Sequence, residues 1–98
     1  MQAYTQMLQI LRAMQLPILT VEYIVENAFA DEEVETKHVV AYAHNGKTTD
    51  FVFVRMPKST EFTLFSIYHL NMDFNQAIAH FGKITLRQPG ALMRLESL

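Results

Sequence analysis

The chain has 98 residues, of which half are apolar and 18% are charged, and its formal net charge is −2. This composition argues against intrinsic disorder, since disordered chains are poor in apolar residues and rich in charge. The slight acid surplus argues against general nucleic-acid binding, and no apolar run reaches the ~18 residues of a membrane span. There are no cysteines, and the N-terminus lacks the features of a signal peptide. We therefore expect residues 1–98 to form one cytoplasmic domain without a membrane segment.

The first periodic segment, residues 3–15, predicts an amphipathic helix. Apolar residues recur there at steps of three and four, namely Tyr4, Met7, Leu8, Leu11 and Met14. Pro17 ends the segment, because the residue before a proline is driven out of the helical conformation.

Residues 19–30 fit two interpretations. As a helix, Val21, Ile24, Val25, Ala28 and Phe29 share a face and Thr20 is the N-cap. As a strand, Leu19, Val21, Tyr23 and Val25 alternate, and the β-branched content supports this pattern. The length and the cap favour a helix, which is the interpretation we adopt.

Three strands are expected next, over residues 36–44, 49–56 and 61–70. The first two flank Asn45-Gly46, and this dipeptide between alternating runs is the strongest short hairpin signal. The third follows a turn that begins at Pro57.

A second amphipathic helix is predicted over residues 72–82. Asp73 and Gln76 have the spacing of a capping box, and Gly82 suits the C-terminal cap. Together the elements predict an α+β fold: an antiparallel meander of three or four strands, with two or three helices packed mainly on one face.

The strand pattern predicts a sheet with two apolar faces. A two- or four-residue turn at Asn45-Gly46 places His38, Val40, Tyr42 and His44 on one face with Phe51, Phe53 and Arg55. A four-residue turn at Pro57 adds Phe62 and Tyr68 to that face. Because a solvated face is normally polar, something must cover each side: helices on one, and the C-terminal segment, a second subunit or a ligand on the other.

We therefore predict a non-enzymatic protein-interaction or regulatory module, without a cofactor, that self-associates as a dimer through the apolar face or an edge strand. The expected interface residues are Tyr42, Phe51, Phe53, Phe62 and Tyr68, because buried aromatic residues dominate interface energetics. An acidic segment, residues 31–35, adds a surface that can steer a basic protein partner.

Two alternatives remain open. The first is a small-ligand-binding protein or small enzyme with a pocket at the same face, in which His38 and Tyr42 are the polar groups. The second is a single-stranded nucleic-acid binder that stacks bases on the aromatic face. No metal site is expected, because no histidine pair has the spacing of a helical zinc motif. Residues 41–48 match a relaxed phosphate-loop spacing, but a strand follows where that motif requires a helix.

Overall fold

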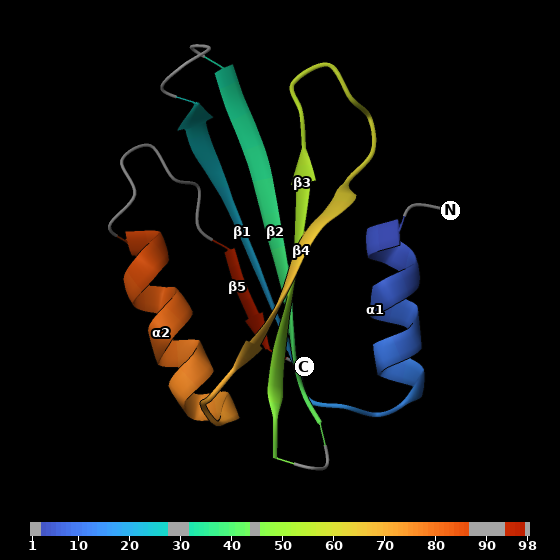
Figure 1. Ribbon diagram of the computed structural model, residues 1–98, viewed down its shortest axis with the longest axis vertical. Coiled ribbons are helices and arrows are strands. Elements are labelled where there is room, and N and C mark those ends of the chain that lie inside the picture. Colours follow the sequence, from blue (N-terminus) through green and yellow to red (C-terminus); the bar gives the residue numbers. More distant parts are fainter. Residues whose placement is uncertain (1–2, 28–31, 44–45, 87–93, 98) are drawn as a thin grey trace.

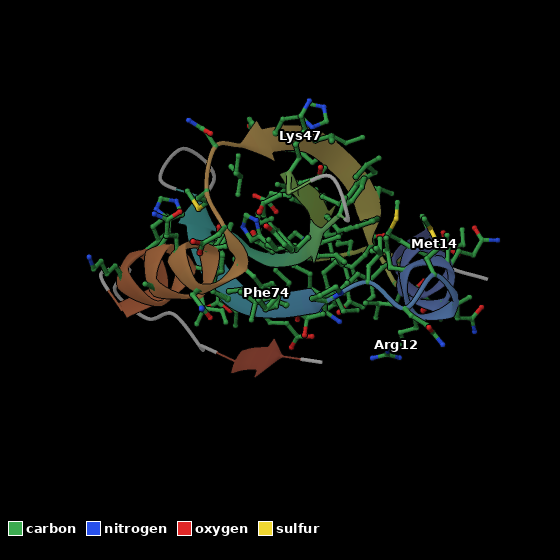
Figure 2. All side chains as sticks on the ribbon, turned by 90° about the horizontal axis from the view of Figure 1, so that it is seen from below. Arg12, Met14, Lys47 and Phe74 are labelled. Atoms are coloured by element: carbon green, nitrogen blue, oxygen red, sulfur yellow. The ribbon has the colours of Figure 1, made fainter. Side chains whose placement is uncertain are left out.

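The protein is built around one antiparallel sheet flanked by two helices. The computed structural model describes residues 3–27, 32–43, 46–86 and 94–97. In chain order these residues form α1 (Ala3–Ala13), β1 (Ile18–Asn27), β2 (Glu32–Tyr42), β3 (Thr48–Arg55), β4 (Thr63–Leu70), α2 (Phe74–Leu86) and β5 (Arg94–Ser97). Figure 1 shows α1 and α2 on opposite sides of the sheet, and Figure 2 shows from one end how strongly the sheet curls.

The strands lie in the order β4-β3-β2-β1-β5, and each neighbouring pair is antiparallel. Strands β1 to β4 form a four-stranded meander, which confirms the predicted α+β class with an antiparallel sheet. The fifth strand, β5, pairs with the outer edge of β1. Among the described strands, β4 and β5 are therefore the two edges.

The helix predicted over residues 19–30 is wrong, because Ile18–Asn27 is strand β1. This strand lies between β2 and β5, and neighbouring residues Ile18 and Leu19 are both fully buried in different apolar clusters. A strand covered on both faces does not alternate apolar with polar residues, so its pattern resembles one side of a helix. Tertiary burial on both sides decided the conformation of this segment.

Each helix covers its own face of the sheet. Leu11 of α1 packs in a cluster with Ile18, Val39 and Phe53. Ala77 and Phe81 of α2 pack in a second cluster, with Leu19, Val21 and Val40 of the sheet. The two helices thus do not gather mainly on one face, as the sequence suggested. They supply the cover that each apolar face requires.

The connection between β2 and β3 has five residues, because the last pair of the ladder is Tyr42 with Thr48. Ala43 N–H donates to the Lys47 carbonyl at 2.9 Å, and Gly46 has the positive φ of 79° that favours glycine. Asn45 lies outside the described residues. Because five is odd and the predicted turns were even, the predicted register is wrong by one residue, and β3 presents the opposite set of side chains to each face.

Helix α2 begins at Phe74, two residues after the predicted start, and it ends later than predicted. Asp73 Oδ1 accepts from the backbone N–H of Gln76 at 2.8 Å, and Gln76 Oε1 accepts from the backbone N–H of Asp73 at 2.9 Å. These two bonds confirm the capping box. The helix continues past Gly82 to Leu86. Gly82 is therefore an interior helical residue and not the C-terminal cap.

Candidate functional site

The structure separates the six predicted site residues into two groups on opposite faces. Phe51, Phe53 and Phe62 belong to the cluster under α1. His38 and Tyr42 pair with Val52 and Thr48, and Tyr68 pairs with Asp50, so these three lie on the face under α2. The expected single aromatic surface is therefore not formed.

Phe53 and Phe62 are buried in the core, and Phe51 is partly buried against it. Phe53 is 1% exposed and Phe62 is 7% exposed, and both rings contact Tyr4 of α1, at centroid distances of 5.5 and 5.9 Å. Rings in this setting hold α1 against the sheet. They are not available as a platform for nucleic-acid bases, which requires exposed aromatic faces.

His38 lies at the centre of a hydrogen-bonded chain on the other face. Its Nδ1 is 2.8 and 2.9 Å from the two carboxylate oxygens of Asp50, and its Nε2 is 2.8 Å from the Tyr23 hydroxyl. The imidazole also contacts the ring of Phe81 from α2, at a centroid distance of 5.0 Å. Three strands and one helix thus meet at this side chain, which is 8% exposed.

The contacts fit a neutral His38, in which Nδ1–H donates to the Asp50 carboxylate and Nε2 accepts from the Tyr23 hydroxyl. Burial, and secondarily the nearby Asp50 carboxylate, raise the pKa of Tyr23, so its phenol stays protonated at neutral pH.

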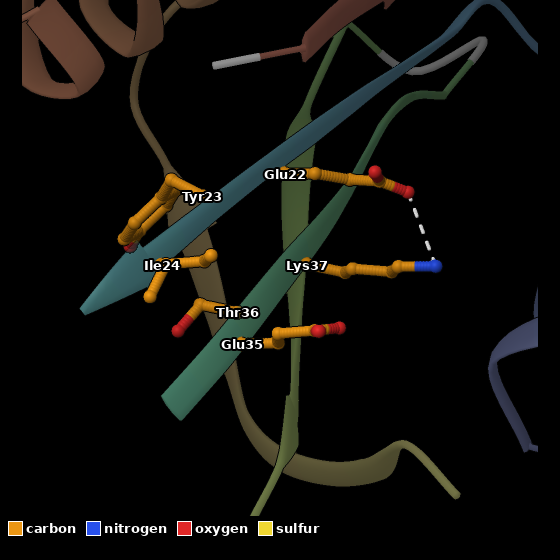
Figure 3. Close-up of a pocket in the computed structure, with 6 residues that line it drawn as sticks. All are labelled: Glu22, Tyr23, Ile24, Glu35, Thr36 and Lys37. Atoms are coloured by element: carbon orange, nitrogen blue, oxygen red, sulfur yellow. Dashed lines mark ion pairs between the residues drawn. The ribbon is translucent and has the colours of Figure 1, made fainter. Parts of the chain in front are cut away.

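A cavity of about 200 Å³ lies beside Tyr23, at the middle of the β1–β2 pair. Figure 3 shows that its lining side chains point to both sides of these strands, with Tyr23 and Thr36 on one side and Glu22 and Lys37 on the other. Glu22 and Lys37 form an ion pair at 3.1 Å. The polar groups therefore do not converge on a common ligand position, as they do in ligand sites.

The second predicted polar group, Tyr42, lies well away from His38. Four residues separate them on β2, which corresponds to about 13 Å along a strand. The Tyr42 hydroxyl is near Gly46 in the β2–β3 turn, 3.6 Å from where a Cβ on that glycine would lie. The two side chains do not flank one pocket, so the arrangement expected for the ligand-binding alternative is not present.

Among the described residues, four exposed apolar side chains lie on the edge strand β4. Leu64, Phe65, Ile67 and Tyr68 are 44, 70, 49 and 52% exposed. Helix α1 contacts β4, and two further apolar side chains are exposed, Ile10 of α1 and Met14 just after the end of the helix. We call these six residues the β4 surface. Of them, the sequence reasoning named only Tyr68 as a site residue.

A bulge interrupts the pairing of this strand with β3. Val52 pairs with Ser66 while Phe53 pairs with Leu64, so Phe65 is an extra residue on β4. The strand has the sequence Thr-Leu-Phe-Ser-Ile-Tyr-His-Leu, without lysine, arginine, aspartate, glutamate or proline. Natural edge strands normally carry such residues to prevent pairing with other chains.

The sequence contained signals for the residues that were missed. Asp50 is the one acidic residue in the run 48–55, and a five-residue turn places it next to His38 on the same face. Four apolar residues within 64–68 at the last strand of a meander indicate an exposed edge, since that strand has one neighbour. Both inferences require the register of the meander, and that of β2 and β3 depends on the length of the turn between them.

Other predicted features are present in part. Of the acidic segment 31–35, Asp31 lies outside the described residues, and Glu35 forms an ion pair with Arg55. Among the described residues, no group of three histidine, aspartate or glutamate side chains is arranged to hold a metal ion. Neither described helix has the length and hydrophobicity needed to cross a membrane.

Comparison with protein-family models, with curated proteins and with solved structures finds no match for this chain.

Proposed function

We propose that the protein is a protein-interaction module that self-associates through the β4 surface, with a second copy of the chain as the partner. The observation that carries the proposal is the exposure of Leu64, Phe65, Ile67 and Tyr68 on an edge strand. An exposed edge can accept another strand, because its outer backbone N–H and C=O groups have no partner within the sheet.

Self-pairing suits the chemistry of β4. In an antiparallel pair related by a two-fold axis, residues near the axis face the same residues of the other copy. A charged residue there would face its own charge, and like charges directly opposite one another destabilise a sheet. Strand β4 carries no permanently charged residue, so a second copy meets no such repulsion.

The apolar side chains add burial to the strand pairing. Phe65 alone is 70% exposed, and Ile10 of α1 and Met14, one residue past the end of that helix, are each 56% exposed. Removing apolar surface from water stabilises a complex by roughly 25 cal/mol per Å² before association costs. A second copy that pairs with β4 can therefore add hydrophobic contact to backbone pairing, with Leu64 and Ile67 on the α1 side of the strand and Tyr68 on the α2 side.

The test is the mass in solution, measured by light scattering over a roughly hundredfold range of concentration. We expect dimers at high concentration that dissociate on dilution. Phe65→Lys places a charge on the exposed bulge residue and is expected to give monomers throughout. Ala79→Lys adds the same charge to an exposed position of α2 and serves as the matched control, with the mass of the unmodified chain.

Either of two results overturns the proposal: a monomer at the highest concentration, or a dimer that Phe65→Lys leaves intact. The first result favours a foreign protein strand as the partner of this edge. The second places the dimer interface on another surface.

A further inference from the structure

Strand β4 carries one side chain whose charge changes between weakly acidic and neutral pH, that of His69. The sequence of the strand is Thr-Leu-Phe-Ser-Ile-Tyr-His-Leu. Histidine ordinarily titrates between about pH 5 and 8, whereas tyrosine ionises near pH ~10 and the other side chains of the strand are neutral. His69 is exposed, like Ile67 and Tyr68 just before it. It therefore lies on the edge that the proposed self-association uses.

Within its own chain, the contacts described for His69 do not include a carboxylate. Its Nδ1 lies 3.4 Å from the Thr49 hydroxyl on β3, which is a neutral group. His69 also lines an open cavity together with Lys47, Leu70 and Asn71. The charged residue that shares this cavity with His69 is thus a second cation. A positive charge on the exposed imidazole is therefore stabilised mainly by water.

Acidic residues occur on β3 and beyond both ends of β4. Asp50 is on the neighbouring strand, but it faces the α2 side and belongs to the buried network, whereas His69 pairs with Thr49. Asp73 follows the strand, and its carboxylate accepts from the backbone N–H of Gln76 at the start of α2. Glu61 is exposed and precedes the strand. The strand itself contains no acidic residue.

Pairing of two β4 strands would remove water from His69 without supplying a carboxylate. In a two-fold antiparallel pair, His69 faces a residue of the second copy's β4, which is a hydroxyl, apolar or aromatic residue or His69 itself. A charged imidazole there is either desolvated against a neutral side chain or set against its own charge, and both arrangements are unfavourable. Glu61 would face His69 only in a register that leaves the end of β4 unpaired.

We propose that protonation of His69 releases the self-association through β4, so that the chain pairs at neutral pH and separates in weakly acidic solution. The inference rests on the proposed function, since it concerns the regulation of the same strand. A permanently charged residue would block an edge strand at every pH, whereas histidine blocks it only when protonated. One residue is sufficient, because two-fold symmetry places two copies of it in the interface.

The test is the dissociation constant of the dimer, measured by light scattering on dilution at about pH 7.5 and about pH 5.5 and at equal ionic strength. We expect the constant to rise at least about tenfold at the lower pH, because like or unpaired charges across an interface are strongly unfavourable. His69→Gln, which cannot gain the charge, is expected to remove this ratio between the two pH values. His69→Lys, which is charged at both, is expected to give monomers at both.

His80→Gln is the matched control, because His80 is an exposed histidine of α2, and this variant should keep the full pH response. A dimer that is equally tight or tighter at the lower pH overturns the switch, and so does a pH response that persists in His69→Gln. Monomers at about pH 7.5 overturn the self-association and the switch together. A dimer at that pH which acid does not dissociate overturns the switch alone, so the two failures are distinguishable.

Discussion

The charged side chains on the two faces of the sheet differ in their surroundings. The neighbouring residues Lys37 and His38 of β2 show the difference. Lys37 points to the α1 face, where its ammonium lies 4.5 and 4.3 Å from the ring centroids of Tyr4 and Phe62 and 3.1 Å from Glu22. His38 points to the α2 face and bonds Asp50 and Tyr23. Each of the two side chains contacts an aromatic ring of the helix on its own face, Tyr4 of α1 for Lys37 and Phe81 of α2 for His38.

Exposure separates the two networks. The side chains of Lys37 and Glu22 are 21 and 29% exposed, whereas those of His38 and Asp50 are 10 and 5% exposed. Water can solvate the first pair if it separates, so the pair contributes little to stability. The buried pair has no such alternative, and removal of one member leaves the other desolvated. We therefore expect the α2 face to depend on its polar network and the α1 face to depend on its apolar packing.

The largest expected loss of stability concerns the apolar cluster under α1. Phe53 is fully buried under α1 and contacts Tyr4. Phe53→Ala is expected to lower the free energy of unfolding by about 4 kcal/mol, because it removes the ring and leaves a cavity. Urea denaturation measures the change. Phe65→Ala, at the most exposed phenylalanine described, should cost far less in a monomer, and equal costs would contradict the assignment of Phe53 to the core.

The next effect concerns the buried pair on the α2 face. Asp50→Ala is expected to lower the free energy of unfolding by about 3 kcal/mol, since His38 then lacks its carboxylate partner. The double variant His38→Leu/Asp50→Ala should cost less than the sum of the two single changes, because the pair is lost only once. Additive costs in urea denaturation would show that the two side chains do not depend on each other.

Tyr23→Phe tests the outer end of the same chain. At neutral pH it should cost about 1 kcal/mol, the value of one hydrogen bond. Because the folded-state pKa of Tyr23 is raised above 10.0, the unfolded chain releases this proton first, and stability is lost as the pH rises above 10. The melting temperature of the unmodified chain should therefore fall more steeply above pH 10 than that of Tyr23→Phe. Parallel melting curves for the two chains above pH 10 would contradict this expectation.

The smallest effect is expected for the exposed pair on the α1 face. Lys37→Met keeps the aliphatic stem over Tyr4 and Phe62 and removes the charge. The expected cost is about 0.5 kcal/mol at low salt, and added salt should reduce it by screening. A loss as large as that of Asp50→Ala would remove the distinction between the two faces.

Local pattern alone was sufficient for several elements. The apolar stripe of residues 3–15 and the Asp73–Gln76 capping box predict helices where α1 and α2 begin, and alternating β-rich runs predict β2, β3 and β4. These features depend on residues three or four apart, or on adjacent residues, so they are visible without the fold. The requirement for cover on both faces of the sheet was also visible, because the residues predicted on each face are mostly apolar.

Tertiary structure decided the rest, because those features depend on contacts between distant segments. Burial between β2, β5 and two helices made residues 18–27 a strand. The β2–β3 turn has five residues, whereas the predicted turn had two or four, and this difference shifts the register by one residue. His38 therefore lies on the opposite face from Phe51 and Phe53 and next to Asp50. One residue of register exchanges every side chain between faces. The sequence by itself therefore determined the fold class and its main elements, whereas the grouping of side chains into sites was determined only when the strands paired.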